Sequence, residues 1–226
     1  MELSIGGIPK NEVLHYLGWR GNELPQPEEE RLNAAREELL RRVRPRFVWR
    51  RFPLGREGGL SVPAAELPLE GEELGEMLRD CGDCVLLAVT LGSEAERLIR
   101  SAGARDMSRL LLLDACGTAA VEAACDEAER LIRLRLAPGE YLTDRFSPGY
   151  GGFPLTAQRP LLRALEAEKR IGLTLTESLM LTPGKSVTAV LGVADRPRRK
   201  RFRGCGHCGL FETCTYRKAG SYCGRT

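Results

Sequence analysis

The stretch Thr143-Asp144-Arg145-Phe146-Ser147-Pro148-Gly149-Tyr150-Gly151-Gly152-Phe153-Pro154 decides how the rest of the chain is interpreted. Five of its twelve residues are glycine or proline, which excludes a helix interior or a central strand. Such a segment holds its backbone along a fixed path and leaves N–H and C=O groups available to a ligand. Arg145 can offer a planar fork to a carboxylate or phosphate. The alternative is a tight surface turn with a solvated arginine.

Two further motifs follow this loop. Leu175-Thr176-Glu177-Ser178 begins 25 residues after Tyr150, and Pro183-Gly184-Lys185-Ser186-Val187 comes next. Together with the Arg-x-x-Pro-Gly-Tyr pattern of the loop, their order and spacing resemble the reactivation domain of cobalamin-dependent methionine synthase. The resemblance is best over residues 110–193. Before it, residues 13–18 and 90–92 resemble the stand-alone form of the domain, a separate subunit that serves a truncated methionine synthase.

The resemblance implies a chemistry. The family's domain binds S-adenosylmethionine and presents it to a cobalamin that has been oxidised to inactive cob(II)alamin; one electron and one methyl group then restore methylcobalamin. The expected partners are the cobalamin-binding module of methionine synthase, or another corrinoid protein, and an electron donor such as flavodoxin or ferredoxin. No catalytic residue is expected, because the task is to orient the methyl group and exclude water. Whether such a methyltransferase-type component is itself an enzyme stays open.

A long helix is predicted over residues 106–134, and its middle consists almost entirely of small residues, which let a ligand or another backbone approach closely. Asp114, Thr118 and Glu122 are spaced four residues apart and therefore share one face. A carboxylate among apolar neighbours is costly to bury without a cationic partner. An ion pair with a neighbouring arginine is therefore one interpretation of Glu122. The other is a ligand contact, because Val121-Glu122-Ala123 resembles the Ala-Glu-Ala setting of a ligand-binding glutamate in the family.

The resemblance assigns roles to several residues of the loop and the helix. Arg145 is expected to take the methionine carboxylate of S-adenosylmethionine, and Glu122 to complement its cationic end. Backbone groups at Ser147 and Gly149, with the ring of Tyr150, are expected to hold the adenosine. These roles follow from the family and not from the local composition.

The motif at residues 175–178 supplies two further expected site residues. The resemblance places Glu177 and Ser178 at the floor of the ligand pocket or facing the corrin. Ser186 and Val187 belong to the matched strand, so a structural role is expected for them. The family has a tyrosine-bearing segment after that strand, whereas this chain has a basic run there.

Length and composition are those of an ordinary soluble protein. The 226 residues suit one sizeable domain with a small appendix, and the net charge of +3 is too small to indicate a nucleic-acid partner. No apolar run approaches the roughly 20 residues that a membrane span needs, and the N-terminus lacks the pattern of a signal peptide. A cytoplasmic protein is expected, in which the eight cysteines form no disulfide framework.

Strands and helices are predicted to be interspersed along the chain. Apolar or alternating runs predict strands at residues 47–52, 85–90 and 186–193, and a short strand from residue 173. Helical periodicity predicts helices at residues 11–16, 28–43, 70–79, 94–102 and 157–170. Asn11, Ser93 and Thr156 are the expected N-caps of three of these helices. The pattern indicates an α+β fold with a mixed or largely antiparallel sheet and packed helices, as the resemblance also implies.

The chain changes character after residue 195. An activation-domain-like part, residues 1–195, is expected to be followed by a basic, cysteine-rich tail, residues 196–226. Six arginines and lysines lead into four cysteines with the spacing C-x2-C-x5-C-x8-C: Cys205, Cys208, Cys214 and Cys223. In a cytoplasmic protein this spacing predicts a metal site, and the basic residues favour the thiolates that bind metal.

The spacing does not identify the metal. Four thiolates suit either structural zinc or a cubane iron–sulfur cluster. A cluster could pass the electron that reactivation consumes, and the basic run could steer an acidic electron carrier to it; zinc would only anchor the tail. His207 could replace one cysteine as a zinc ligand. Cys81 and Cys84 form a second C-x2-C pair, but Cys84 begins an apolar strand, so a buried thiol is the preferred interpretation.

Two other functions compete with reactivation. A nucleic-acid-binding protein using a basic zinc-knuckle tail is compatible with the four cysteines and their flanking charges, although the basic residues are confined to one short segment. A sensor that binds S-adenosylmethionine without chemistry is the other. Calorimetry with S-adenosylmethionine and an RNA shift assay separate the first of these rivals from reactivation.

Overall fold

A four-stranded antiparallel sheet lies at the centre of the computed structural model, which describes residues 1–19, 24–104 and 106–197. Its strands follow the order β1-β4-β8-β5. They are β1 (Arg46–Pro53), β4 (Asp83–Thr90), β8 (Ser186–Ala194) and the short β5 (Tyr141–Leu142). In the shared register, Leu86 of β4 pairs with Arg50 on one side and with Val190 on the other. The prediction of an α+β fold with an antiparallel sheet is confirmed.

The two central strands are apolar throughout because both faces of the sheet are covered. Along β4, Val85, Leu87 and Val89 point into one core, while Cys84, Leu86 and Ala88 point into the other. The side chains of a strand alternate between faces, so a continuous apolar run can serve two cores at once. This explains why residues 85–90 show no polar alternation.

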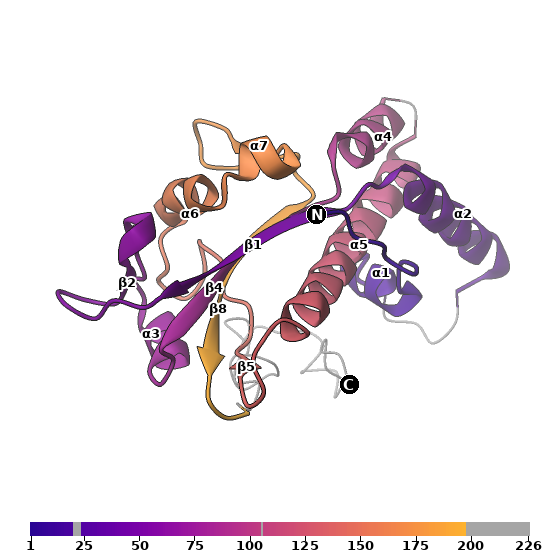
Figure 1. Ribbon diagram of the computed structural model, residues 1–226. Coiled ribbons are helices and arrows are strands. Elements are labelled where there is room, and N and C mark those ends of the chain that lie inside the picture. The colour runs from indigo at the N-terminus through magenta and orange to yellow at the C-terminus, as the bar shows by residue number, and fades with distance from the viewer. Residues whose placement is uncertain (20–23, 105, 198–226) are drawn as a thin grey trace.

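One face of the sheet carries the helices that are drawn on the right in Figure 1. They are α1 (Lys10–Tyr16), α2 (Gln26–Arg42), α4 (Ser93–Gly103) and α5 (Met107–Arg133). Helix α5 packs against the other three and against β4, and its buried residues are mostly small, such as Ala119, Ala120 and Ala124. These small side chains bring the long helix close to its neighbours, as the sequence predicted.

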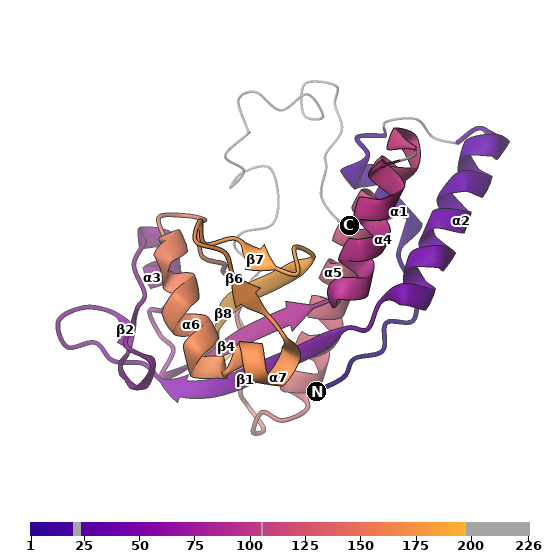
Figure 2. The same cartoon turned by 90° about the horizontal axis from the view of Figure 1, so that it is seen from above.

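Shorter elements cover the opposite face, as Figures 1 and 2 show. They are α3 (Glu72–Leu78), α6 (Gln158–Leu165), α7 (Ala167–Ile171), the 3-10 turns η1 (Pro63–Ala65) and η2 (Leu155–Ala157), and two small ribbons. One ribbon pairs β2 (Ser61–Val62) with β3 (Leu67–Pro68), and the other pairs β6 (Thr174–Leu175) with β7 (Leu181–Thr182). Leu161, Leu162 and Leu165 are buried in this second core, as their spacing predicted.

Several local predictions were wrong. The helix expected over residues 157–170 is interrupted at Glu166, which adopts a left-handed conformation at φ 51° between α6 and α7. None of the three expected N-cap side chains makes a capping hydrogen bond. Asn11 and Ser93 lie inside the first turn of their helices, and Thr156 lies in η2, ahead of α6. Asp106, which was not predicted as a cap, accepts a hydrogen bond from the Arg109 N–H at 3.1 Å.

The cysteines in the described residues are all buried. Cys84 begins β4, and its burial raises the pKa of its thiol to about 12, as burial also does for Cys116 on α5. The interpretation of Cys84 as a buried thiol is therefore confirmed. None of the helices in the described ranges is both long enough and apolar enough to span a membrane.

Candidate functional site

A polar stripe runs along one side of helix α5. We use this name for Asp114, Thr118, Glu122, Asp126 and Glu129, which are spaced by four, four, four and three residues. Such spacing keeps side chains on one face of a helix. Among the described residues, two cations approach the stripe from outside the helix, Lys185 near its beginning and Arg145 near its end.

Lys185 lies in the turn between β7 and β8. Its Nζ forms an ion pair with Asp114 at 2.8 Å and donates a hydrogen bond to the Thr118 hydroxyl at 2.9 Å. The lysine stem crosses the helix at Gly117, where a Cβ would lie 3.0 Å from the Lys185 Cε. Asp114 and Thr118 are therefore engaged by a neighbouring part of the protein.

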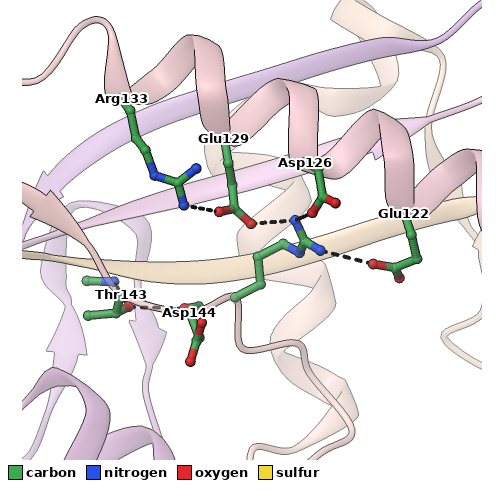
Figure 3. Close-up of polar contacts among 8 residues, drawn as sticks. Glu122, Asp126, Glu129, Arg133, Thr143 and Asp144 are labelled. Carbon is green, nitrogen blue, oxygen red and sulfur yellow. Dashed lines mark hydrogen bonds and ion pairs between the residues drawn. The ribbon is translucent and has the colours of Figure 1, made fainter. Parts of the chain in front are cut away.

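Arg145 occupies the other end of the stripe. Its Nη1 donates to Asp126 at 3.0 Å and to Glu129, and its Nη2 donates to Glu122 at 3.0 Å. Glu129 also accepts a hydrogen bond from Arg133, one turn further along α5. Figure 3 shows the three carboxylates in a row on the helix, with Arg133 beyond Glu129. We call these five residues the arginine–carboxylate cluster.

The electrostatics of the cluster keep Arg145 charged. Its side chain is only 13% exposed. Burial by itself lowers the pKa of Arg145, but the negative charge of the acidic groups around it more than compensates, so that the pKa is raised. The charged groups are Glu129, Glu122 and Asp126, whereas burial raises the pKa of the adjacent Cys125 thiol and keeps it neutral. With three carboxylates and two guanidinium groups, the cluster carries a formal charge of −1.

The position of Glu122 agrees with both interpretations that the sequence left open, an ion pair with an arginine and a ligand contact. It forms the expected ion pair with an arginine, and that arginine is Arg145 itself. Its side chain is nevertheless 33% exposed, so a ligand can reach the carboxylate as well. Thus the two residues that the resemblance assigns to the carboxylate and to the cationic end of one ligand lie in direct contact.

The loop at residues 143–154, which we call the organising loop, is fixed from both sides. The N–H and C=O groups of Phe146 pair with those of Val190 on β8, at 2.9 and 2.8 Å. Behind the loop, Gly71 lies so close that a Cβ there would be 2.7 Å from the Gly151 carbonyl oxygen and 2.9 Å from the Gly152 carbonyl carbon. Gly71 is at φ 106°, a conformation that side-chain-bearing residues rarely adopt. The loop is therefore packed directly against the backbone at Gly71, without an intervening side chain.

The remaining predicted loop residues lie at the surface end of the loop. The Gly149 N–H donates to the Phe153 carbonyl at 2.7 Å, and the Ser147 carbonyl accepts from the Tyr150 N–H at 3.3 Å. The backbone groups expected to meet a ligand are thus partly used inside the loop. The Tyr150 side chain is 71% exposed.

Glu177 and Ser178 lie in the exposed turn between β6 and β7. The Ser178 hydroxyl lies 2.9 Å from the Thr176 hydroxyl, within hydrogen-bond distance. Among the contacts of the described residues, none joins this turn to Arg145 or Glu122. The structure does not bring these two predicted site residues to the cluster.

A cavity of about 510 Å³ opens beside the cluster. Its walls come from the N-terminal segment, including Ser4, Gly6 and Glu12, and from one side of α5. Asp126 lines the cavity and also accepts the hydrogen bond from Arg145. The cavity is within the size range of small-molecule sites.

Sequence reasoning missed three members of the cluster, Asp126, Glu129 and Arg133. Their signal was present, because they extend the spacing of Asp114, Thr118 and Glu122 by one, two and three further turns. The tail cysteines Cys205, Cys208, Cys214 and Cys223 lie outside the described residues, so the predicted metal centre stays a prediction.

The comparisons with known proteins agree with this fold. A model of the family "Vitamin B12 dependent methionine synthase, activation domain" matches residues 87–209, more than half of the chain. A crystal structure of the MetH reactivation domain bound to AdoHcy is similar in fold, with a TM-score of 0.62 and 19% sequence identity over 99% of this chain and 86% of that one. No curated protein is matched. The matched residues include α5, the organising loop and β8, and the chain belongs to the family of activation domains of vitamin B12 dependent methionine synthases.

Proposed function

We propose that this chain binds S-adenosylmethionine through Arg145 and supports reactivation of a cobalamin-dependent methionine synthase or a related corrinoid methyltransferase. One observation carries the proposal. Arg145, in the motif shared with the family, is held against three carboxylates, while its Nε–H donates to no residue in the described parts of the chain. An arginine edge is thus left for the ligand in a five-residue cluster whose formal charges sum to −1.

The methionine end of S-adenosylmethionine fits these charges. It carries one carboxylate, one ammonium and one sulfonium, and so has a net charge of +1. The Nε edge of Arg145 can pair with the carboxylate. The carboxylates of Glu122 and Asp126 lie 3.0 Å from the same guanidinium, where they complement the two positive groups. The proposed ligand therefore balances the formal charge of −1 on the cluster.

The adenosine end is proposed to lie against the organising loop. The Gly149 N–H is engaged with Phe153, and the Ser147 carbonyl accepts one hydrogen bond from the Tyr150 N–H. The contact we propose therefore uses the Gly149 carbonyl and the second lone pair of the Ser147 carbonyl. The exposed ring of Tyr150 offers a flat apolar face on which an adenine can stack. For Glu177 and Ser178, the proposal is a contact with the corrin, because their turn lies outside the cluster.

In this proposal the cobalamin belongs to the partner, which is a cobalamin-binding module. The corrinoid supplies the cobalt that accepts one electron and the methyl group, and S-adenosylhomocysteine is the other product. The present chain contributes binding, orientation and exclusion of water. The electron is proposed to come from flavodoxin or ferredoxin.

Calorimetry tests the ligand. Wild-type protein is expected to bind S-adenosylmethionine and S-adenosylhomocysteine. Arg145→Lys keeps the positive charge but loses the planar fork, and should weaken binding by roughly 1.5–3 kcal/mol. Arg163→Lys is the matched control, because among the described residues Arg163 pairs with the exposed Glu66 alone, on the opposite face of the sheet. Unchanged binding in Arg145→Lys would contradict the assignment, and binding of RNA alone would favour the rival function.

The tail is proposed to hold one metal centre at Cys205, Cys208, Cys214 and Cys223, with an iron–sulfur cluster preferred over zinc because reactivation consumes an electron. Anaerobic purification, metal analysis and visible absorption test this. Iron with a broad visible band is expected. Zinc without iron would overturn the electron-relay idea and keep the site, whereas the absence of both metals would remove it.

A further inference from the structure

The orientation of Arg145 is set from one side by a buried acid. The side chain of Glu129 is 10% exposed, and its two oxygens accept hydrogen bonds from different arginines, Oε1 from Arg145 and Oε2 from Arg133. Arg133 is one turn further along α5, so Glu129 is held between a residue of its own helix and the loop. A carboxylate fixed at both oxygens has little freedom to rotate.

The hydrogen bonds of Arg145 are distributed unequally. Nη1 has two hydrogens and both are used, one by Asp126 and one by Glu129. Nη2 gives one hydrogen to Glu122. The remaining hydrogens are one on Nη2 and the one on Nε, which donates no hydrogen bond to the described residues. Because the guanidinium group is planar, hydrogen bonds that fix Nη1 also fix the direction of the Nε–H bond.

We propose that Glu129 is a positioning residue that aims the Nε edge of Arg145 at the ligand carboxylate, and that the Arg133–Glu129–Arg145 chain makes the site selective for ligands with an intact amino-acid end. This inference rests on the proposed function. Glu129 does not touch the ligand. It acts by holding Nη1, since a bidentate pair with a carboxylate requires the planar fork to be aligned.

The experiment compares two ligands that differ at the amino-acid end. S-adenosylhomocysteine has the α-carboxylate, whereas 5′-methylthioadenosine has the same adenosine and thioether without the carboxylate and the amino group. Glu129→Gln should weaken the binding of S-adenosylhomocysteine about tenfold, which is the effect of losing one well-aligned charged contact. The affinity for 5′-methylthioadenosine should change less than about twofold.

Two further variants keep the test independent of folding. Arg133→Gln removes the outer partner of Glu129 from the exposed side of the helix, and is expected to reduce the preference for S-adenosylhomocysteine by a smaller factor. Glu38→Gln is the matched control, because Glu38 uses both oxygens to bind Arg109 at the far end of α5, at 2.7 Å. It should lower the melting temperature without changing the ratio of the two dissociation constants.

The outcomes are distinguishable. If Glu129→Gln and Arg133→Gln melt at lower temperature but keep the wild-type ratio, Glu129 is structural and the inference is wrong. If the wild type binds both ligands equally, Arg145 does not meet a carboxylate and the inference also falls. If the wild type binds neither ligand, the proposed function itself fails, and the inference fails with it.

Discussion

Two cations of the described residues, Lys185 and Arg145, reach the polar stripe of helix α5. The number of carboxylates around each of them differs. Lys185 faces one carboxylate, Asp114, and one hydroxyl, Thr118. Arg145 faces three carboxylates, one of which it shares with Arg133. Lys185 and Asp114 cancel as a pair, whereas the five residues of the arginine–carboxylate cluster sum to a formal charge of −1.

The difference separates a contact that serves only the fold from one that is suited to a ligand. An ion pair of one cation and one carboxylate at the edge of a helix joins two segments and leaves no net charge for a ligand to neutralise. A buried arginine with an excess of carboxylates costs free energy through desolvation and through repulsion among the acids, and a cationic ligand relieves part of that cost. We therefore expect the two ends of the stripe to respond differently to substitution and to ligand.

The largest effect is expected for Arg145→Ala. This change leaves Glu129 buried beside two other carboxylates, and removal of one partner of a buried pair typically costs about 3–5 kcal/mol. Chemical denaturation measures the free energy of unfolding, and calorimetry should detect no ligand binding. A variant with wild-type stability would show that the cluster is more solvated than its burial indicates.

The next effect concerns the backbone behind the loop. Gly71→Ala places a Cβ against the carbonyl of Gly151 in a left-handed conformation, and should cost about 1–3 kcal/mol. Gly117→Ala meets the flexible end of Lys185 at 3.0 Å and the Cδ1 of Ile99 at 3.1 Å. Both are side-chain atoms that can shift, and the gain in helix propensity, about 1 kcal/mol, should offset these contacts. Thermal denaturation of the two variants compares a Cβ that meets fixed backbone atoms with one that meets side-chain atoms able to move. Equal losses would contradict the distinction.

Glu122→Gln should have an intermediate effect that divides between stability and binding. The Glu122 side chain is one-third exposed, so the loss of its ion pair with Arg145 should lower the free energy of unfolding by about 1 kcal/mol. Ligand binding should weaken as well, and the ligand-induced rise in melting temperature should therefore shrink. A lower melting temperature with an undiminished ligand-induced rise would remove Glu122 from the ligand site.

The smallest effect is expected for Lys185→Met. Methionine keeps the apolar stem over Gly117 and removes an ion pair whose carboxylate is 54% exposed, so the loss should stay below about 1 kcal/mol. Affinity for S-adenosylhomocysteine should not change. A large loss of affinity would mean that the ligand extends along the whole stripe, and the comparison between its two ends would have to be abandoned.

The sequence was informative about which residues share a face and less so about which partners they meet. The spacing of Asp114, Thr118 and Glu122 predicted one face of a helix, and the apolar runs at residues 85–90 and 186–193 predicted the two central strands, as observed. Periodicity carries no information on a contact 23 residues away, so the pairing of Glu122 with Arg145 was left open. The break at Glu166 was missed because the apolar spacing of α6 continues into α7 without a glycine or proline at the boundary.

The place of β8 in the sheet also determines when the protein can fold. Leu86 of β4 pairs with Val190, 104 residues further along the chain. During synthesis at about 5–20 residues per second, β4 waits about 5–20 s for this neighbour. Throughout that interval it has an open strand edge and apolar side chains on both faces, which are features of aggregation-prone intermediates. A nascent chain that stops before β8 therefore cannot complete its sheet, whereas one that stops after residue 197 contains every strand of it.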